Sequence, residues 1–416
     1  MNEYFINTDS HNVIKDIIKI QDNIRLDCSV VLNSTTNNIL YNMYNDIKNS
    51  IDKIKSIFDD RVKLIISNDN FVVDNNLDNA LRSIYVSKRI SNYIFNTDSK
   101  SIKYTFHDNK EYRINFIVYN KTIDNNYLDY LNMCAMNIFS IIHFLEKSRN
   151  LSCKTDILEI YIFFTPFKKE LPQQKDYVIG PENVNSGFTL PCRDITQVIV
   201  YRKEEFMKVI IHELIHSMAI DLTHTNSDYK NRLDKFFNIE STYNLNETYT
   251  ETWALIINIL FFLGFTIDNH IDEVNIIQII NDCISIETKF SIIQVNKILN
   301  FMSLSLKDLT VRNKNSRFKE NTHVFGYYIM KYLLLYDLNK FINVCNYKSS
   351  NILTISSDKQ HIVKYKIDKF IDIIVKLIEN QEFIIKFSKI ENWFDSVNNK
   401  NNILFNTMRM TCIELA

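Results

Sequence analysis

The chain has 416 residues and a formal net charge of −1, with 46% hydrophobic and 23% charged residues. This composition is that of a globular protein and excludes a disordered chain. The near-zero charge, without a long run of one sign, argues against a general nucleic-acid or membrane-surface binder. Gly and Pro number only four each, which favours long uninterrupted helices.

The N-terminus and the cysteines carry information about location. Residues 1–7 have neither the basic opening nor the apolar run of a secretion signal. The longest apolar stretch, Trp253–Ile267, is shorter than the roughly 18 residues of a spanning helix. Seven cysteines are odd in number, scattered and without a CxxC pair, which is typical of reduced thiols. We therefore expect a soluble protein in the cytoplasm or another reducing compartment, with neither a nucleic-acid nor a membrane partner.

The first hundred residues are mostly helical by pattern, because apolar residues recur three and four positions apart. The predicted helices are Val13–Ile20, Asn38–Phe58 and Leu77–Phe95. This part of the chain has no chemical motif. We expect a lobe that packs against the rest of the protein, contacts a partner, or covers a site.

After residue 101 the apolar period changes to two, which is typical of strands. Tyr104–His107 and Tyr112–Tyr119 flank a polar turn and predict a hairpin. A helical pattern follows at Tyr127–Lys147, and then strand patterns at Leu158–Phe164 and Gln197–Tyr201. Hairpin, helix, strand, loop and strand then lead directly into the next helix.

The loop Thr165–Arg193 holds all four prolines and two of the four glycines, so we expect a fixed irregular shape. Its last part contains Ser186, Gly187 and Phe188. These three residues are candidates for an edge strand that binds an extended peptide by main-chain hydrogen bonds. A structural turn that happens to contain glycine is an equally good interpretation.

The helix that follows carries the chemical motif His212-Glu213-Leu214-Ile215-His216. Positions four apart share one face of a helix, so the two imidazoles can bind one metal ion. Glu213 lies beside them, where it could act as a general base on water. The alternative is an amphipathic helix whose histidines are satisfied by hydrogen bonds in the core.

A third ligand decides between these interpretations. One zinc family takes a histidine at the sixth position after the second one, and Leu222 stands there, so that family is excluded. His224 is two residues too far for the same geometry. His107 and His143 have no partner at metal-ligand spacing and are interpreted as ordinary packed or surface histidines.

A second apolar helix, which begins near Asn246 and continues to Leu263, offers the missing ligand. Glu247 and Glu251 are four apart and place two carboxylates on one face. One carboxylate would complete a site of two histidines and one glutamate with an open fourth position, as catalytic zinc requires. The other could accept the remaining ring N–H of a ligating histidine. The alternative for Glu251 is a solvated carboxylate that complements the helix dipole.

The two motifs, His212-Glu213-x-x-His216 and Asn246-Glu247-x-x-x-Glu251, resemble those of the gluzincin metallopeptidases, to which thermolysin belongs. The resemblance implies that Glu247 is the third zinc ligand. It also implies that Glu251 matches the family's acidic residue that supports the ligands without binding zinc. A looser likeness, by composition and by the stretch NETYTETWA, is to metallopeptidases encoded by large DNA viruses. Clostridial neurotoxin light chains share the letters HELIH but lack the second motif.

The C-terminal part again has a helical pattern. Predicted helices are Val274–Ile284, Ile286–Met302, Glu320–Lys331 and Phe370–Leu377, and a small hairpin is predicted within Ile352–Tyr365. Glu320, His323, Tyr327 and Lys331 form a polar stripe along one of these helices. A zinc peptidase needs a donor for the oxyanion of its tetrahedral intermediate. Tyr327, Tyr328 and His323 are the candidates, although simple packing explains each of them equally well.

The sequence thus predicts an α+β fold, predominantly α, with a zincin-like N-terminal sheet, an active-site helix and a helical C-terminal lobe. The predicted domains are residues 1–100, 101–225 and 226–416. One Zn²⁺ per chain would be held by His212, His216 and Glu247, and the reaction would be hydrolysis of peptide bonds in a peptide or protein substrate. The lack of a GxMEN-type motif before His212 favours an endopeptidase.

Two alternatives remain from the sequence. The first is a catalytically silent zincin-like binding or scaffold protein, and the second is a zinc hydrolase of non-peptide amides. The oligomeric state is left open.

Overall fold

The computed structural model describes residues 7–24, 30–119, 122–174, 177–222, 229–267, 270–310, 317–355, 359–396 and 402–414. It is 58% helix and 14% strand, so the predicted α+β class, predominantly α, is confirmed. The chain forms two compact units, which we call the sheet unit (Met43–Lys169 and Asn185–Ile220) and the helical unit (Met1–Asn42, Glu170–Val184 and Asp221–Ala416). The division into three domains stays a prediction.

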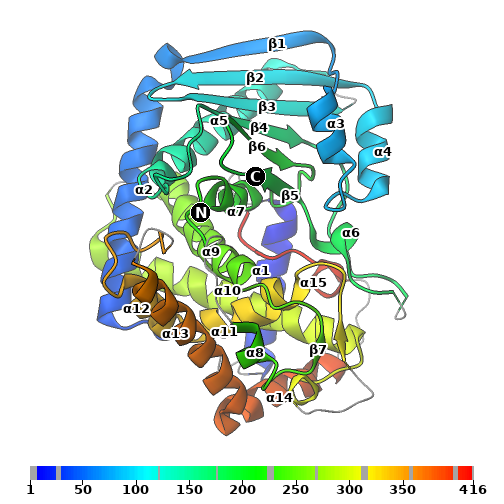
Figure 1. The fold of residues 1–416 in the computed structure, drawn as a ribbon, viewed down its shortest axis with the longest axis vertical. Helices are drawn as coiled ribbons and strands as arrows, with labels where there is room; N and C mark the ends of the chain where they lie inside the picture. The colour runs from blue at the N-terminus through cyan, green and yellow to red at the C-terminus, as the bar shows by residue number, and fades with distance from the viewer. Residues whose placement is uncertain are drawn as a thin grey trace. The chain divides into compact units, whose positions relative to one another are not determined.

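The sheet unit contains a six-stranded sheet of order β1-β2-β3-β4-β6-β5 (Figure 1). Neighbours β1, β2 and β3 are antiparallel, β3, β4 and β6 are parallel, and β5 is antiparallel to β6. The strands are β1 (Val62–Asn70), β2 (Ser99–His107), β3 (Glu111–Tyr119), β4 (Ile157–Phe163), β5 (Gly187–Leu190) and β6 (Ile195–Val200). The predicted hairpin and the two later predicted strands are confirmed as β2, β3, β4 and β6.

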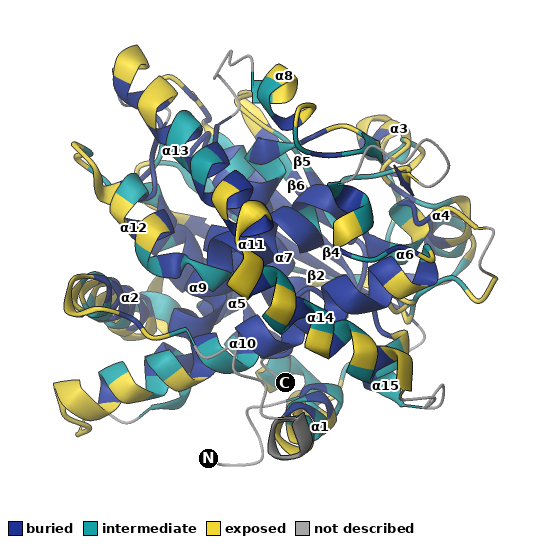
Figure 2. Cartoon of the chain, turned by 90° about the horizontal axis from the view of Figure 1, so that it is seen from below, coloured by how far each residue is buried: buried dark blue, intermediate teal, exposed yellow. Residues whose placement is uncertain are grey.

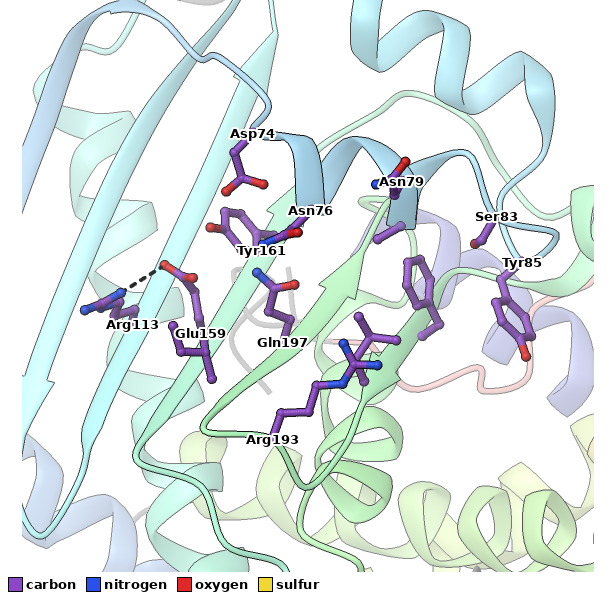
Figure 3. A pocket seen from close by; sticks show the side chains of 14 residues that line it. Asp74, Asn76, Asn79, Ser83, Tyr85, Arg113, Glu159, Tyr161, Arg193 and Gln197 are labelled. Carbon is purple, nitrogen blue, oxygen red and sulfur yellow. Dashed lines mark ion pairs between the residues drawn. The ribbon is translucent and has the colours of Figure 1, made fainter.

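Helices cover both faces of this sheet (Figure 1). They are α2 (Ser34–Arg61, in this unit from Met43), α3 (Asn75–Leu81), α4 (Lys88–Asn96), α5 (Asn125–Glu146) and α7 (Phe206–Ser217). Tyr161 and Ile199 point to the face where α3 and α4 close an apolar cluster. The Cβ position of Gly187 points to the other face, at Val209 of α7, and α7 packs there beside α5. Between α3 and the sheet lies a cavity of about 760 Å³ (Figure 3).

The helical unit is built around α9, which packs against α10, α11 and the π-helix η2. Its elements are α1 (Thr8–Ile24), α6 (Pro181–Val184), α8 (Tyr229–Leu233), β7 (Ile239–Glu240), α9 (Leu245–Thr266), α10 (Glu273–Phe301), η1 (Lys307–Leu309), β8 (Phe318–Lys319), η2 (Phe325–Met330), α11 (Lys331–Tyr336), α12 (Leu338–Asn346), α13 (Gln360–Glu379), α14 (Gln381–Ser396) and α15 (Ile403–Asn406). In Figure 2, exposed and buried residues alternate along α13 and α14, as expected of amphipathic surface helices.

Two helices among the described residues are long and apolar enough to cross a membrane by length and composition alone. They are α5 and α9, and 61% and 94% of their most apolar windows are buried inside the protein. Burial of this kind is that of core helices, which agrees with a soluble protein core.

Two predictions of helices in the N- and C-terminal parts are wrong in detail. The predicted helix Leu77–Phe95 is interrupted, because α4 starts afresh at Ser87, whose hydroxyl oxygen accepts a hydrogen bond from the Ile90 N–H at 3.4 Å. The predicted helices Val274–Ile284 and Ile286–Met302 are one continuous helix, α10, because no Gly or Pro separates them.

Two further elements differ from prediction. The hairpin expected at Ile352–Tyr365 is wrong for its second half, since residues from Gln360 onward belong to α13, and residues 356–358 lie outside the described residues. The helix expected to begin at Glu320 begins instead at Val324. Glu320 forms a β-bridge with Ile179, and the first helical turns are of the π type.

The expectation that all thiols are reduced is also wrong for two cysteines. Cys153 and Cys192 form a disulfide across 39 residues of sequence, with their Cα atoms 4.7 Å apart. The free cysteines among the described residues are all buried, and they are Cys134, Cys283, Cys345 and Cys412. Cys28 lies outside the described residues.

The segment 402–414 belongs to the helical unit; it begins with the short helix α15, and every residue from Thr407 to Glu414 is buried. Polar side chains from α9, α10, η2 and α11 bind its main chain. Tyr328 and Lys331 donate to the carbonyl oxygens of Met408 (2.5 Å) and Met410 (3.0 Å), Lys297 donates to that of Thr407, and Asn258 donates to that of Ile413 (2.9 Å). The Glu287 carboxylate accepts from the N–H groups of Cys412 (3.0 Å) and Ile413 (2.9 Å). We call residues 402–414 the buried strap.

Candidate functional site

A buried ion pair fixes the turn from β6 into the motif helix α7. Lys169 Nζ lies 2.9 Å from Glu205 Oε2, and both side chains are almost wholly shielded from solvent. Glu205 precedes the helix with a left-handed backbone, φ 58°. Next to it, the Arg202 guanidinium donates to the carbonyl oxygens of Asn185 (2.9 Å) and Lys168 (2.7 Å). Removing one partner of a buried ion pair lowers the stability of the fold strongly, because the other charge is left uncompensated. These contacts therefore fix the start of α7.

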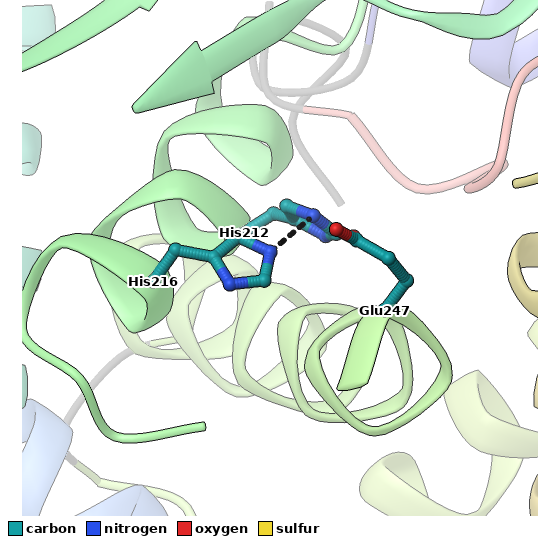
Figure 4. Close-up of side chains that lie close together, drawn as sticks. All are labelled: His212, His216 and Glu247. Atoms are coloured by element: carbon teal, nitrogen blue, oxygen red, sulfur yellow. Dashed lines mark hydrogen bonds between the residues drawn. The ribbon is translucent and has the colours of Figure 1, made fainter. Parts of the chain in front are cut away.

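The two motif histidines lie side by side on α7, and a dashed line joins them in Figure 4. Their Nε2 atoms are 3.1 Å apart. Two nitrogen ligands at about 2.0–2.1 Å from one zinc ion, at a tetrahedral angle, would be about 3.3 Å apart. His212 is buried and His216 half-buried. The pair therefore fits two ligands of one metal, and it also fits one ring donating a hydrogen bond to the other.

Glu213 lies against the candidate substrate strand. A Cβ atom on Gly187 would come within 2.9 Å of Val209 Cγ1 and 3.3 Å of Glu213 Cγ. Any larger residue at position 187 would therefore press on both side chains. Glu213 is itself buried, with 6% of its surface exposed. The structure thus brings the predicted general base and the predicted substrate strand together.

The candidate substrate strand is the edge strand β5, which begins at Gly187 and ends at Leu190. Ser186 precedes it, and its carbonyl oxygen accepts from the Tyr201 N–H at 2.8 Å. Because antiparallel pairs alternate, the main-chain groups of Phe188 face β6, whereas those of Gly187 and Thr189 point away from it. The role of this edge in binding substrate stays a prediction.

The other candidate carboxylates lie in the first two turns of α9, in the helical unit. The Asn244 side chain caps the helix by accepting from the Glu247 N–H at 3.1 Å. Glu247, which Figure 4 also labels, is half-buried. Glu251 is completely buried, and Lys331 Nζ lies 3.8 Å from its Oε1. The interpretation of Glu251 as a solvated carboxylate is therefore wrong. Its predicted contact with a ligating histidine stays a prediction.

Gly326 lets the π-helix η2 approach the start of α9. A Cβ atom there would lie 3.1 Å from both the Asn244 carbonyl oxygen and Thr248 Oγ1. This close packing fixes the segment that carries the three oxyanion candidates relative to the turn that carries Glu247, within one unit.

The three oxyanion candidates differ in what they contact. Tyr328 is buried, and its hydroxyl donates a hydrogen bond to the Met408 carbonyl oxygen at 2.5 Å, so this side chain supports the buried strap. Tyr327 and His323 are half-buried, and their ring centroids are 6.0 Å apart. The role of each of the three as an oxyanion donor stays a prediction.

Glu320, at the start of the predicted polar stripe, is a pH-sensitive support of this segment. Its carboxylate accepts from Ser241 Oγ, from the Val324 N–H and from the Phe325 N–H at 3.3 Å. Burial raises the pKa of Glu320 to about 7, although these donors lower it. Since its unfolded pKa is near 4.5, the folded protein holds the proton more tightly, and stability is lost as the pH rises from about 4.5 to 7.

We therefore expect Glu320→Gln to remove part of this pH dependence. The variant keeps an acceptor oxygen but carries no buried charge, so its melting temperature should exceed that of the wild type at pH 8. At pH 5 the melting temperatures of the two proteins should be similar. Between pH 5 and pH 8 the Glu320 carboxyl should cost the wild type about 2–3 kcal/mol of unfolding free energy, a loss that the variant should not show. Thermal unfolding from pH 5 to 8 measures this. Parallel pH curves for both proteins would contradict it.

Some residues that hold the elements of the candidate site in place are not predicted from the sequence. The sequence places Lys331 on the polar stripe but gives it no role, and its pairing with Glu251 is invisible because 80 residues separate them. Lys169, Arg202 and Glu205 carry no motif. The sequence offers one local indication of their importance: Arg202 and Glu205 are charged residues between an apolar strand and an apolar helix. His224 lies outside the described residues, and His107 and His143 join no candidate metal group among the described residues.

Comparison of the chain with protein-family models, with curated proteins and with solved structures finds no match. The interpretation of this site therefore depends on its own residues.

Proposed function

We propose that this chain is a zinc-dependent metallopeptidase, more specifically an endopeptidase, of the gluzincin type. One zinc ion would be bound by His212, His216 and Glu247. The observation that carries the proposal is the 3.1 Å separation of the two imidazole Nε2 atoms on α7, with Glu213 next to them against strand β5.

The set of donors supports the choice of metal. Among the described residues, His212, His216 and Glu247 are the one group of His, Cys, Asp and Glu side chains suited to hold a metal ion. Two imidazoles and one carboxylate are a set that catalytic zinc uses, with the fourth position left for water or substrate. When bound, zinc supplies a Lewis acid that acidifies water and polarises the scissile carbonyl.

The chain's own residues perform the remaining steps. Glu213 takes a proton from the attacking water and passes it to the leaving amine nitrogen, so that one water is consumed and one carboxylate and one amine are formed. Tyr327 or His323 donates to the oxyanion as the tetrahedral intermediate forms. The main-chain groups of Gly187 and Thr189 hold the substrate extended along β5. The Lys331–Glu251 pair holds the second turn of α9 and so orients Glu247.

The metal content of the purified protein tests the proposal. We expect one zinc per chain after metal replenishment, and a loss of at least tenfold in zinc affinity for Glu247→Ala, because the one carboxylate ligand of the proposed site is removed. Elemental analysis and competition with a chromogenic chelator measure both. The matched control is Glu240→Ala, an exposed glutamate of the same unit, which should bind zinc like the wild type. Wild-type protein that binds no zinc would rule out the proposed function.

A reducing, cytosol-like compartment is part of the proposal. It is supported by the four free thiols of the described residues, which are all buried, whereas the Cys153–Cys192 disulfide counts against it, because such bonds are rare in cytosolic proteins. Mass spectrometry of alkylated thiols from freshly lysed cells would decide which state the pair has in the cell.

A further inference from the structure

The cavity on the far face of the sheet is formed by residues that alternate along the strands. The pairs Arg113 with Glu159, Glu159 with Gln197, and Gln197 with Leu190 are register neighbours on β3, β4, β6 and β5. Side chains at matched positions of neighbouring strands point to the same face. All these residues line the cavity, and α3 covers it. The cavity therefore lies on the face opposite α7 and reaches as far as the edge strand.

The acidic groups of this cavity have partners. Glu159 Oε1 lies 3.8 Å from Arg113 Nη1, and Arg113 Nε lies 2.6 Å from Glu111 Oε1. Asp74 caps α3, because its Oδ1 accepts from the Leu77 N–H at 2.8 Å. In Figure 3, Asp74 is at the end of the cavity beside α3, well separated from Arg193.

Arg193 is different, because its guanidinium has no hydrogen-bond or ion-pair partner among the described residues. Its backbone is nevertheless held in place. The Arg193 N–H donates to Thr196 Oγ1 at 3.2 Å, Thr196 Oγ1 lies 3.2 Å from the Arg193 carbonyl oxygen, and the preceding residue, Cys192, is tied to Cys153. A fixed backbone thus presents a free cation at the end of the cavity near β5.

The rest of the lining can hold an extended chain. Phe188 and Tyr85 stack at 5.8 Å and form an aromatic wall, and Gln197 offers an amide donor and acceptor. A peptide added to the free edge of β5 would place every second side chain on this face. Those side chains would point toward the cavity, and the ones between them toward α7.

We infer that this cavity is a specificity site for an acidic side chain, glutamate or aspartate, of a peptide that lies extended along β5, and that Arg193 binds its carboxylate. The site is separate from the histidine pair and sits on the opposite face of the sheet. The inference depends on the proposed peptidase function for its purpose, but binding can be measured without cleavage.

The experiment uses the full-length Glu213→Gln protein and fluorescein-labelled, capped octapeptides of alanine and valine. Each peptide carries one glutamate, glutamine or lysine at one of the eight positions, and fluorescence anisotropy gives its Kd. At the position facing the cavity we expect glutamate to bind about tenfold more tightly than glutamine, since hydrogen bonds to a charged group contribute about that much. Lysine should bind most weakly there.

Variants test whether Arg193 causes the preference for glutamate. Arg193→Gln should reduce the glutamate preference to less than about twofold, and Arg193→Lys should retain part of it, because lysine keeps the charge but loses the fork of the guanidinium. Lys154→Gln is the matched control, an exposed cation of the same unit that does not line the cavity. It should keep the full preference.

The outcomes separate this inference from the proposed function. No binding, equal binding of glutamate and glutamine, a preference for lysine, or a glutamate preference that survives Arg193→Gln would each overturn the inference. If the acidic peptides bind in an Arg193-dependent way but zinc-loaded wild type cleaves none of them, the binding site stands and the peptidase proposal fails.

Discussion

Replacing Glu213 by glutamine is expected to reduce the rate of peptide cleavage by about 10²–10⁴-fold, the range that a positioned general base contributes. An amide cannot accept the proton of the attacking water. The substitution keeps the size of the side chain, which matters because Glu213 Cγ lies against Gly187 and the residue is buried. Zinc content and melting temperature should therefore remain those of the wild type, while cleavage of casein and of a peptide library is nearly lost.

Glu379→Gln is the matched control, since Glu379 is an exposed residue at the end of α13. It should cleave at the wild-type rate. Cleavage by Glu213→Gln at the wild-type rate would mean that another group acts as the base. Zinc-loaded wild type that cleaves neither casein nor the library would instead favour the scaffold alternative, or an amide substrate that is not a peptide.

The second large effect is expected from Glu287→Ala, in the middle of α10. This completely buried carboxylate accepts hydrogen bonds from the Cys412 and Ile413 N–H groups and from Thr411 Oγ1. Removal of the carboxylate leaves the buried Cys412 N–H without this acceptor. The Ile413 N–H and Thr411 Oγ1 keep only their 3.2 Å hydrogen bonds within the strap, to Thr411 Oγ1 and the Ile413 carbonyl oxygen, so the buried strap loosens. We expect a loss of about 3–5 kcal/mol in the free energy of unfolding, because each buried group left unsatisfied costs about 1–3 kcal/mol and these costs are only partly additive.

Urea unfolding followed by circular dichroism measures the loss, and limited proteolysis should show faster cutting within residues 402–414. Glu287→Gln keeps one acceptor oxygen and should lose less stability than Glu287→Ala. Glu273→Ala, an exposed glutamate of the same helix, should change the free energy by less than about 1 kcal/mol. Wild-type stability in Glu287→Ala would show that the strap does not depend on this carboxylate.

Local pattern was sufficient for elements with a strong apolar periodicity. The alternation of Tyr112–Tyr119 and the helical spacing around His212 predicted β3 and α7 correctly. β1 was missed because Val62–Asn70 follows a long helix without a break and carries exposed and charged residues on both sides. It is a strand only because β2 offers it an edge to pair with. Pairing of this kind is tertiary, and no local window contains it.

The candidate site shows the same limit. The spacing of His212, Glu213 and His216 on one helix follows from helical geometry, so the sequence predicted their arrangement. The contact of Glu213 with Gly187, and the pairing of Glu251 with Lys331, join residues 26 and 80 positions apart, and spacing does not predict them. The Cys153–Cys192 bond was missed for the same reason. An odd, scattered set of cysteines does not reveal which two the fold brings together.

The position of the buried strap also sets an order of events during synthesis. The last residue of the sheet unit is Ile220, so that unit can fold while translation continues, whereas the interior of the helical unit is incomplete until the strap has left the ribosome. Helix α1 packs against α10 and α15, so it waits for about 280 further residues until α10 is complete and about 380 until α15 is complete, or roughly 14–76 s at about 5–20 residues per second. Until α10 is complete, the apolar face of α1 lacks both of these partners, and transiently exposed apolar surface of this kind is what chaperones shield.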